Sequence, residues 1–172
     1  MLLDILRNRR SIRQFTNKQL STEHIAQLKE VILRAPTSRG LNPWQFIFVT
    51  NPEILAKLAQ AKAKGSTFIA NSALAVVICA DTTRSDVWTE DCAIAAICLQ
   101  LAVTELGLGS CWSQIRLRSH DENSSAGKYV TNLLKLPSNI DVDCIIAIGY
   151  PAEEKGTYPT DELAWSHIKD IN

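Results

Sequence analysis

One segment of the chain is apolar on almost every side of a helix, and it limits the possible folds more than any other feature. The segment CAIAAICLQLAV, residues 92–103, lies within a predicted helix over residues 88–106. A helix without a polar face must be covered on every side, either by the protein's own core or by a second subunit. Its small alanines permit neighbouring elements to approach closely, and Gly107 is the residue expected just after its end.

Strands and helices alternate along the rest of the chain. Strands are predicted where β-branched, aromatic and apolar residues run together, at residues 44–50, 74–80, 110–115 and 144–148. Ser21 and Asn51 are the expected N-caps of two helices. Helices are predicted over residues 2–8, from Ser21 to about residue 35, from Asn51 onward, and over residues 121–134. This alternation predicts an α/β or α+β fold, and 172 residues suit a single domain.

The composition argues against several classes of protein. Eighteen basic residues balance eighteen acidic ones, so we expect no broad polyanion-binding surface and no nucleic-acid partner. The five cysteines lie in or beside apolar runs without C-x-x-C spacing, which favours buried, reduced thiols over a metal site. Three scattered histidines do not suggest a catalytic triad. We expect a cytoplasmic protein without a membrane partner, because the sequence shows neither a signal-peptide pattern nor a membrane-length apolar run.

A cluster of arginines stands out against this neutral background. In RRSIRQF, residues 9–15, Arg9, Arg10 and Arg13 surround Ser11, and residues 5–22 contain no acid. The cluster could be a solvated basic face or a nucleic-acid patch, although the net charge disfavours the patch. It could also be a phosphate clamp, because guanidinium groups bind phosphate oxygens bidentately and a nearby hydroxyl adds a donor.

Two further stretches bear on function. APTSRGLNPWQF, residues 35–46, is a turn-forming connection whose hydroxyl and amide side chains are typical of a ligand-binding loop, although ordinary loop chemistry explains it equally well. The tail, residues 152–172, is polar and carries isolated large side chains at Tyr158, Leu163, Trp165 and Ile168. Since these are too sparse to pack on one another, we expect the tail to lie across another surface, such as a partner chain.

Four motifs together resemble the nitroreductase family of flavin-dependent oxidoreductases over essentially the whole chain. They are RRSIRQF, APTSRGLNPWQF, the long apolar helix ending in ELGLGSCW, and IAIGYP before the polar tail. The resemblance implies an α+β sandwich with a mostly antiparallel central sheet flanked by helices. It also implies one FMN-binding domain over residues 1–172 and an intertwined homodimer with FMN at the interface. The tail, residues 152–172, would cross to the partner subunit.

The resemblance also implies which residues contact FMN. Arg9, Arg10 and Ser11 match positions that hold the phosphate and ribityl chain, and Arg13 matches a cation near the pyrimidine edge. The backbone around Trp112, Ser113 and Gln114 would lie near flavin N5. The full set of expected cofactor contacts is Arg9, Arg10, Ser11, Arg13, Pro36, Thr37, Ser38, Asn42, Trp112, Ser113 and Lys155, with residues 36–38 supplied by the other subunit.

Two regions, the loop of residues 35–46 and the start of the tail, depart from the family pattern. Gly40 replaces a frequent asparagine, and Asn42, which replaces a frequent glutamine, would take over a polar flavin contact. Past the GYP turn this chain has Lys155-Gly156 in place of a Lys-Arg or Lys-Pro pair, so Lys155 either touches the phosphate alone or is solvated. Asp91 is expected to be structural or to lie near the substrate mouth. No metal site is implied, and no side chain is expected to be catalytic.

The implied function is hydride transfer from NADH or NADPH, through flavin N5, to a small-molecule oxidant such as a nitroaromatic or quinone, by a ping-pong mechanism. The sequence contains no G-x-G-x-x-G motif that would suggest a Rossmann-type nicotinamide site, so the donor would bind only transiently. Three alternatives stay open. They are a family member with specialised flavin chemistry, a non-enzymatic flavin-binding or redox-sensing dimer, and a basic interaction module without flavin.

Overall fold

A four-stranded antiparallel sheet forms the centre of the protein. The computed structural model describes residues 1–171. The strands lie in the order β1-β2-β4-β3, and each neighbouring pair is antiparallel. They are β1 (Trp44–Val49), β2 (Leu74–Asp81), β3 (Gly109–Gln114) and β4 (Ile140–Gly149). Because β2 and β4 occupy the middle of the sheet, their faces are buried, which explains the apolar sequences of β2 and of the second half of β4.

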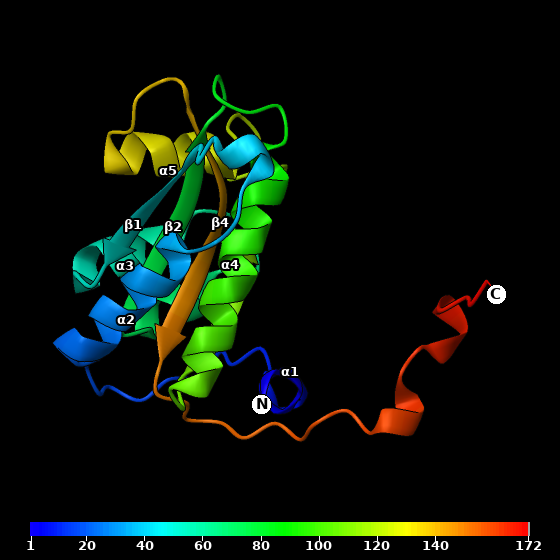
Figure 1. Ribbon diagram of the computed structural model, residues 1–172. Coiled ribbons are helices and arrows are strands. Elements are labelled where there is room, and N and C mark those ends of the chain that lie inside the picture. Colours follow the sequence, from blue (N-terminus) through cyan, green and yellow to red (C-terminus); the bar gives the residue numbers. More distant parts are fainter. Residues whose placement is uncertain (172) are drawn as a thin grey trace.

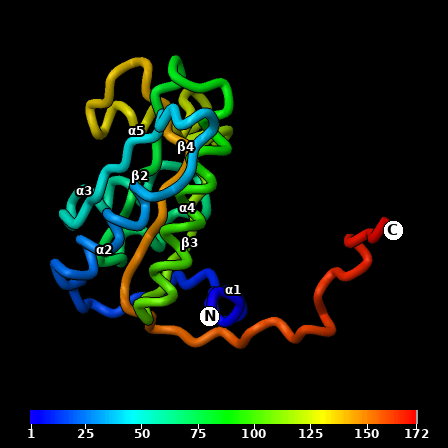
Figure 2. Tube along the Cα trace, in the orientation of Figure 1, coloured from blue at the N-terminus to red at the C-terminus, as the bar shows by residue number. Residues whose placement is uncertain are grey.

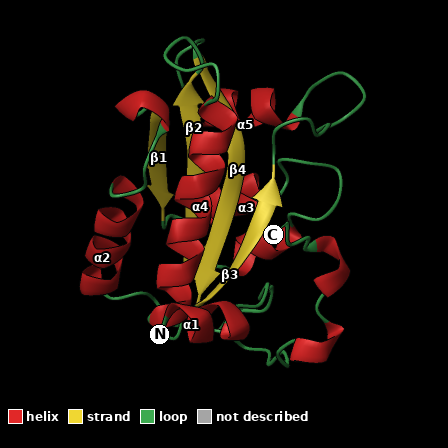
Figure 3. Cartoon of the chain, turned by 45° about the vertical axis from the view of Figure 1, so that its right-hand side comes forward, coloured by secondary structure: helices red, strands yellow, loops and turns green. Residues whose placement is uncertain are grey.

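Helices cover both faces of this sheet (Figures 1 and 3). On one face α2 (Thr22–Leu33) and α4 (Trp88–Glu105) pack on β2 and β4, and α4 is the longest helix. On the other face α3 (Pro52–Leu58) and α5 (Ala126–Leu134) pack on the same strands. The short helix α1 (Leu2–Asn8) lies beside α4. This arrangement confirms the predicted α+β class and the mostly antiparallel sheet flanked by helices.

Local sequence signals account for several helix ends. The Ser21 hydroxyl accepts a hydrogen bond from the His24 N–H at 3.1 Å, and Asn51 Oδ1 accepts from the Glu53 N–H at 2.9 Å. Pro52 occupies the first turn of α3, where its missing N–H costs nothing. Gly107, after the end of α4, has a φ of +70°, which glycine adopts without strain. These three predicted boundaries are confirmed.

Two predicted boundaries were wrong. The helix predicted from residue 121 begins only at Ala126, because Asp121 Oδ1 accepts hydrogen bonds from the N–H groups of Asn123 and Ser124 and holds this segment in a turn. The strand predicted from residue 144 begins at Ile140. Its first half was not predicted because it contains Asp141 and Asp143, and acidic residues are uncommon in strands.

The apolar helix α4 is covered by the protein's own core along one side only. Its inner face, which includes Cys92, Ala96 and Leu99, is fully buried against the sheet and α2. On its outer face Ile94 and Ile97 are each 39% exposed. The core of this chain therefore leaves part of an apolar helix face uncovered, and the alternative of a second subunit stays in force for that face.

The tail runs away from the body of the protein (Figures 1 and 2). Residues 156–171 are exposed and contain only two short 3₁₀ turns, Thr160–Glu162 and Trp165–His167. All four predicted anchors are exposed, and Trp165 leaves 56% of its surface to solvent. One contact ties this part of the tail to the body, since the Arg10 guanidinium lies 4.3 Å from the centre of the Tyr158 ring.

All five cysteines are free thiols. Four are buried and Cys98 is partly exposed. Burial raises the pKa of the Cys79 thiol to about 12, so this group stays protonated at neutral pH. Within residues 1–171 no group of three or more histidine, cysteine and acidic side chains could hold a metal ion. No helix in the same part of the chain is long and apolar enough to cross a lipid bilayer.

Candidate functional site

The arginine segment runs along the outer edge of β3, which is an edge strand of the sheet. The Ile12 N–H donates to the Ser110 carbonyl at 2.9 Å, and Ser11 pairs with Ser110 as in a parallel strand. Phe15 pairs in turn with Pro151 at the end of the GYP turn. Three of the four motifs, RRSIRQF, ELGLGSCW and IAIGYP, therefore meet at one edge of the sheet.

Two glycines make this close approach possible. A Cβ atom on Gly109 would lie 2.9 Å from the side chain of Ile12, and one on Gly149 would lie 2.9 Å from Phe15 Cδ1. Neither separation is tolerated between carbon atoms in a packed interior. The apolar residues of RRSIRQF thus dock into the spaces above these two glycines, which fixes the position of the polar residues between them.

The three arginines of this segment lack acidic partners. Arg9 and Arg10 are half-buried and Arg13 is exposed. Within residues 1–171 none of the three forms an ion pair. Glu153, the nearby acid, instead accepts hydrogen bonds from the backbone N–H groups of Arg13 and Gln14 at 2.5 and 3.2 Å. The guanidinium groups are therefore left available for an anion.

Lys155 also belongs to this cluster. Its ammonium group donates to the Ser11 carbonyl at 2.6 Å and lies 3.3 Å from Glu153 Oε1. Its side chain is only 26% exposed, so it is not freely solvated. Lys155 ties the beginning of the tail to the arginine segment. The next residue, Gly156, has open space around it.

The middle of β3 carries the other predicted contacts on this edge. Trp112 Nε1 donates to Gln114 Oε1 at 2.9 Å, and Gln114 Nε2 donates to the Arg116 carbonyl at 3.1 Å. These bonds hold the end of the strand in a fixed shape. Ser113 is fully buried, and its hydroxyl has no hydrogen-bond partner within the described part of the chain. An unpartnered buried hydroxyl is costly, which marks this position as unusual.

The loop of residues 35–43 is anchored to the opposite end of α4. The Ser38 N–H donates to Asp91 Oδ1 at 2.8 Å, and the Ser85 hydroxyl lies 3.3 Å from Asp91 Oδ2. Thr37 donates its hydroxyl proton to Asn42 Oδ1 at 2.8 Å, which closes the loop on itself. Asp91 is buried in the first turn of α4, and these contacts give it a structural role.

One chain does not bring the two halves of the expected site together. The loop with Pro36, Thr37, Ser38 and Asn42 lies at the N-terminal end of α4, and the arginine segment lies at its C-terminal end (Figures 1 and 2). The 14 helical steps from Asp91 to Glu105 span about 21 Å at the rise of an α-helix. Within one chain the two halves of the expected site therefore lie far apart.

Sequence reasoning missed three contributors to this edge. Glu153 holds the backbone of the arginine segment, Gly109 and Gly149 receive its apolar side chains, and Tyr158 stacks on Arg10. The glycines were detectable in the sequence as isolated glycines at the beginning of one strand and the end of another, which often mark close backbone approach. No pattern in the sequence links Glu153 or Tyr158 to residues some 140 positions earlier.

The structure is that of an α+β protein with unpaired arginines along one sheet edge, and comparisons with known proteins identify its family. The model of the nitroreductase family matches residues 6–150. A relative from Archaeoglobus fulgidus, whose name includes NAD(P)H nitroreductase, is 35% identical over 93% of this chain and 91% of its own. The chain therefore belongs to the nitroreductase family.

A solved structure extends this similarity to almost every residue. The FMN-dependent nitroreductase of Clostridium difficile R20291 superimposes with a TM-score of 0.97 at 43% identity, and the match covers 99% of both chains. A Bacillus subtilis relative named FMN reductase (NADPH) is 26% identical over 91% of this chain and 68% of its own.

Proposed function

We propose that this protein is an FMN-dependent oxidoreductase that takes hydride from NADH or NADPH and passes it to a small-molecule acceptor. Its family membership and the activities for which its relatives in Clostridium difficile and Bacillus subtilis are named support an enzyme of this kind. The observation that carries the proposal is the set of arginines along the β3 edge that have no acidic partner, because guanidinium groups without a partner are suited to bind a phosphate.

The residues at this edge fit the phosphate of FMN. Arg9 and Arg10 supply free guanidinium donors, Ser11 supplies a hydroxyl, and Lys155, which is paired with Glu153, adds a third cation. The phosphate of FMN carries roughly two negative charges at neutral pH. Charge-assisted hydrogen bonds, which are about twice as strong as neutral ones, would hold it. Lys155 already touches Ser11, which supports its role beside the phosphate rather than as a solvated lysine.

A homodimer completes the site. The uncovered apolar face of α4, with Ile94 and Ile97, offers an interface of suitable chemistry. If two α4 helices pair in antiparallel fashion about a twofold axis, the loop of residues 36–38 of one subunit comes beside the arginine segment of the other. Asn42 would add a polar contact from the same loop. The tail, residues 152–172, would cross to the partner and bury its exposed aromatic and aliphatic side chains.

When bound, FMN supplies the redox chemistry, accepting hydride at N5 and delivering it to a nitroaromatic, a quinone or a similar oxidant. The protein would bind and orient the cofactor and shield the reaction from water. Arg13 would place a positive charge at the pyrimidine edge, which makes reduction easier. Backbone N–H groups around Trp112 and Ser113 would face N5. Donor and acceptor would use the same place in turn, so the kinetics would be ping-pong.

Steady-state kinetics on purified protein test this proposal. We expect bound FMN, oxidation of NADH or NADPH with menadione or nitrofurazone, and parallel lines in a plot of reciprocal rate against reciprocal donor concentration. Bound FMN without turnover would favour a non-enzymatic flavin-binding dimer. Turnover restricted to a different flavin reaction would favour a specialised family member. A protein that cannot be loaded with FMN would leave only the basic interaction module.

A further inference from the structure

A buried hydrogen-bond network joins the N-terminal end of α4 to the loop of residues 35–43. The Asp91 carboxylate accepts the Ser38 N–H at Oδ1, at 2.8 Å, and the Ser85 hydroxyl at Oδ2, at 3.3 Å, and Asp91 is only 1% exposed. The Ser85 hydroxyl in turn accepts the Val87 N–H at 3.3 Å, just before α4 begins. Both oxygens of the carboxylate are therefore hydrogen-bonded, as a buried carboxylate requires.

The loop itself has a strained backbone. Arg39, Gly40 and Asn42 have φ values of +55°, +65° and +46°. Glycine adopts this left-handed region without strain, but arginine rarely does, and such conformations persist only where neighbouring structure holds them. Within the loop, the Thr37 hydroxyl donates to Asn42 Oδ1 at 2.8 Å and accepts the Asn42 N–H at 3.1 Å. The Thr37 hydroxyl therefore closes the loop, and the network described above fastens the next residue, Ser38, to α4.

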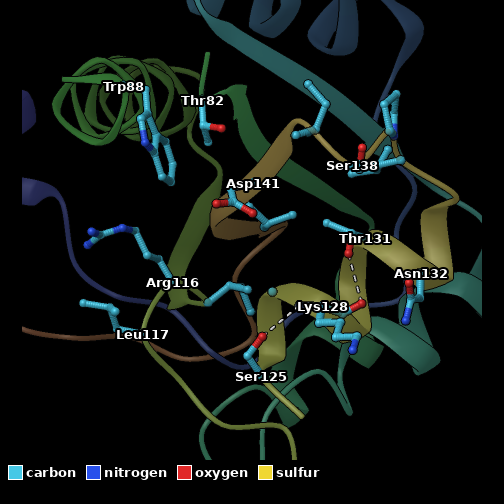
Figure 4. A pocket seen from close by; sticks show the side chains of 16 residues that line it. Thr82, Trp88, Arg116, Leu117, Ser125, Lys128, Thr131, Asn132, Ser138 and Asp141 are labelled. Atoms are coloured by element: carbon cyan, nitrogen blue, oxygen red, sulfur yellow. Dashed lines mark hydrogen bonds between the residues drawn. The ribbon is translucent and has the colours of Figure 1, made fainter. Parts of the chain in front are cut away.

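The segment that carries Ser85 is a firm support for this loop. It is the connection between β2 and α4, residues 82–87. The Thr82 N–H and hydroxyl both donate to the Asn139 carbonyl, at 3.0 and 3.3 Å, which fastens the connection to the turn before β4. Thr82, together with Trp88 at the start of α4, also lines a pocket of about 780 Å³ just beyond the end of β3 (Figure 4). The connection is therefore held in place independently of the loop that it supports.

Two acidic residues, Asp86 and Asp91, touch the loop, and their burial decides which of them holds it. Asp86 forms an ion pair with Arg39, but the Arg39 and Asp86 side chains are 59% and 76% exposed, and exposed ion pairs contribute little. Asp91 binds the Ser38 N–H away from water, where loss of one partner leaves the other unsatisfied. Asp91 is therefore the effective support, and Asp86 is a matched control on the same loop.

We propose that Asp91 is a positioning residue for FMN and that it serves the site whose arginines belong to the partner subunit. The inference rests on the proposed function, in which Thr37 and Ser38 contact FMN from the other subunit. Asp91 would not touch the cofactor. It fixes the backbone of Ser38 and thereby the place of the Ser38 hydroxyl. Since the arginine segment of the same chain lies about 21 Å away along α4, loss of Asp91 should damage the partner's site.

Amide hydrogen exchange, followed by NMR on protein freed of flavin, tests the support by itself. The Ser38 amide should exchange at least about tenfold faster in Asp91→Ala than in the wild type, because its acceptor is lost. Asp91→Asn keeps an acceptor oxygen and should restore most of the protection. Asp86→Asn should leave the exchange rate of Ser38 within about twofold. Equal exchange in the wild type and Asp91→Ala would overturn the support.

FMN titration of mixed dimers then tests the action across the interface. Two affinity tags isolate a heterodimer in which one subunit carries Arg9→Ala with Arg13→Ala and the other carries Asp91→Ala. If Asp91 serves the partner's site, both sets of substitutions fall on one of the two sites, and the other site is intact. The heterodimer should therefore bind one FMN with wild-type affinity, whereas each variant homodimer should bind FMN at least about tenfold more weakly.

Three other results would contradict the proposal or its basis. A heterodimer without a site of wild-type affinity would overturn the action on the partner's site, because each set of substitutions would then damage a separate site. An Asp91→Ala homodimer that binds FMN as tightly as Asp86→Asn would overturn the positioning role. A wild-type protein that binds no FMN would overturn the proposed function and the role of Asp91 in FMN binding with it, and the exchange of the Ser38 amide would still show whether Asp91 holds the loop.

Discussion

Three arginines within five residues repel one another, so placing them together without acidic partners is electrostatically unfavourable. Arg9, Arg10 and Arg13 could each have been neutralised by a neighbouring acid, yet Glu153 binds backbone N–H groups instead. The carboxylate therefore shapes the segment without cancelling its charge. An anionic ligand that supplies the missing negative charge explains both facts.

The first prediction removes two of these charges. Arg9→Ala combined with Arg13→Ala should weaken FMN binding at least about a hundredfold, because hydrogen bonds to charged groups contribute roughly 1.5–3 kcal/mol each. The fold should persist, since neither side chain belongs to the core. Fluorescence titration with FMN measures the affinity and circular dichroism the fold. Arg34→Ala, an exposed arginine paired with Glu30 on α2, is the matched control. Unchanged affinity in the double variant would contradict the assignment.

The second prediction concerns the Glu153 carboxylate. The Arg13 N–H, and then Lys155, hold the pKa of Glu153 below its ordinary value of 4.5. A lowered pKa means that the stabilisation is complete above pH 4.5 and is lost as the pH falls through the pKa of the folded state. The midpoint temperature of unfolding should therefore drop on acidification below pH 4.5 in the wild type, and less steeply in Glu153→Gln. Identical pH profiles would show that this carboxylate contributes nothing.

At the scale of elements, the site depends on a segment without regular secondary structure that is pinned to two strands. Ile12 sits over Gly109 at the beginning of β3, and Phe15 sits over Gly149 at the end of β4. Because the strands are a rigid support, these two contacts hold the polar residues between Ile12 and Phe15 in a fixed position.

The third prediction adds one methyl group at this contact. Gly149→Ala should destabilise the protein by about 1–3 kcal/mol, the usual cost of overpacking, and should weaken FMN binding because Phe15 is displaced. Chemical denaturation and FMN titration measure the two effects. Gly156→Ala is the control, because its Cβ would meet nothing within 4 Å. Similar behaviour of the two variants would mean that the segment is not held by this packing.

Sequence patterns located most elements because their signals were local. The caps at Ser21 and Asn51 and the apolar runs of β1 and β2 are each readable within about ten residues. The first half of β4 was missed because Asp141 and Asp143 break its apolar pattern. The start of α5 was missed because the turn at Asp121 depends on a side-chain hydrogen bond.

The candidate site was only partly predictable for a different reason. The arginine segment and the loop of residues 35–43 were identified as motifs, and the family resemblance assigned them to one cofactor. Their placement at opposite ends of α4 comes from the packing of distant segments, as do the contacts of Glu153 and Lys155 with the arginine segment. The pocket just beyond β3, whose lining includes Trp88 of α4, Asp141 of β4 and Lys128 of α5, joins distant segments, so no single stretch of sequence predicts it.

At the scale of the whole molecule, one chain is incomplete in three respects. Its longest helix exposes isoleucines, its tail exposes aromatic side chains, and the two motifs proposed to bind FMN stand about 21 Å apart along α4. A twofold dimer would resolve all three together, because each subunit would cover the other and complete its site.

The fourth prediction places a charge in this interface. Ile97→Glu should convert the dimer to a monomer and abolish FMN retention, since burial of an unpaired carboxylate costs several kcal/mol. Sedimentation equilibrium measures the mass and the visible spectrum the flavin content. Ala56→Glu, at an exposed position of α3 on the other face of the sheet, should remain dimeric and yellow. A dimeric, FMN-loaded Ile97→Glu protein would rule out the outer face of α4 as the interface.

The most direct test of the central claim is a visible absorption spectrum of the purified protein, recorded without oxygen before and after addition of NADH and then NADPH. The account predicts a flavin spectrum that bleaches with at least one donor and returns when menadione is added. A protein that shows no flavin absorption even after incubation with FMN would contradict it, and the arginine cluster would then be an ordinary basic surface.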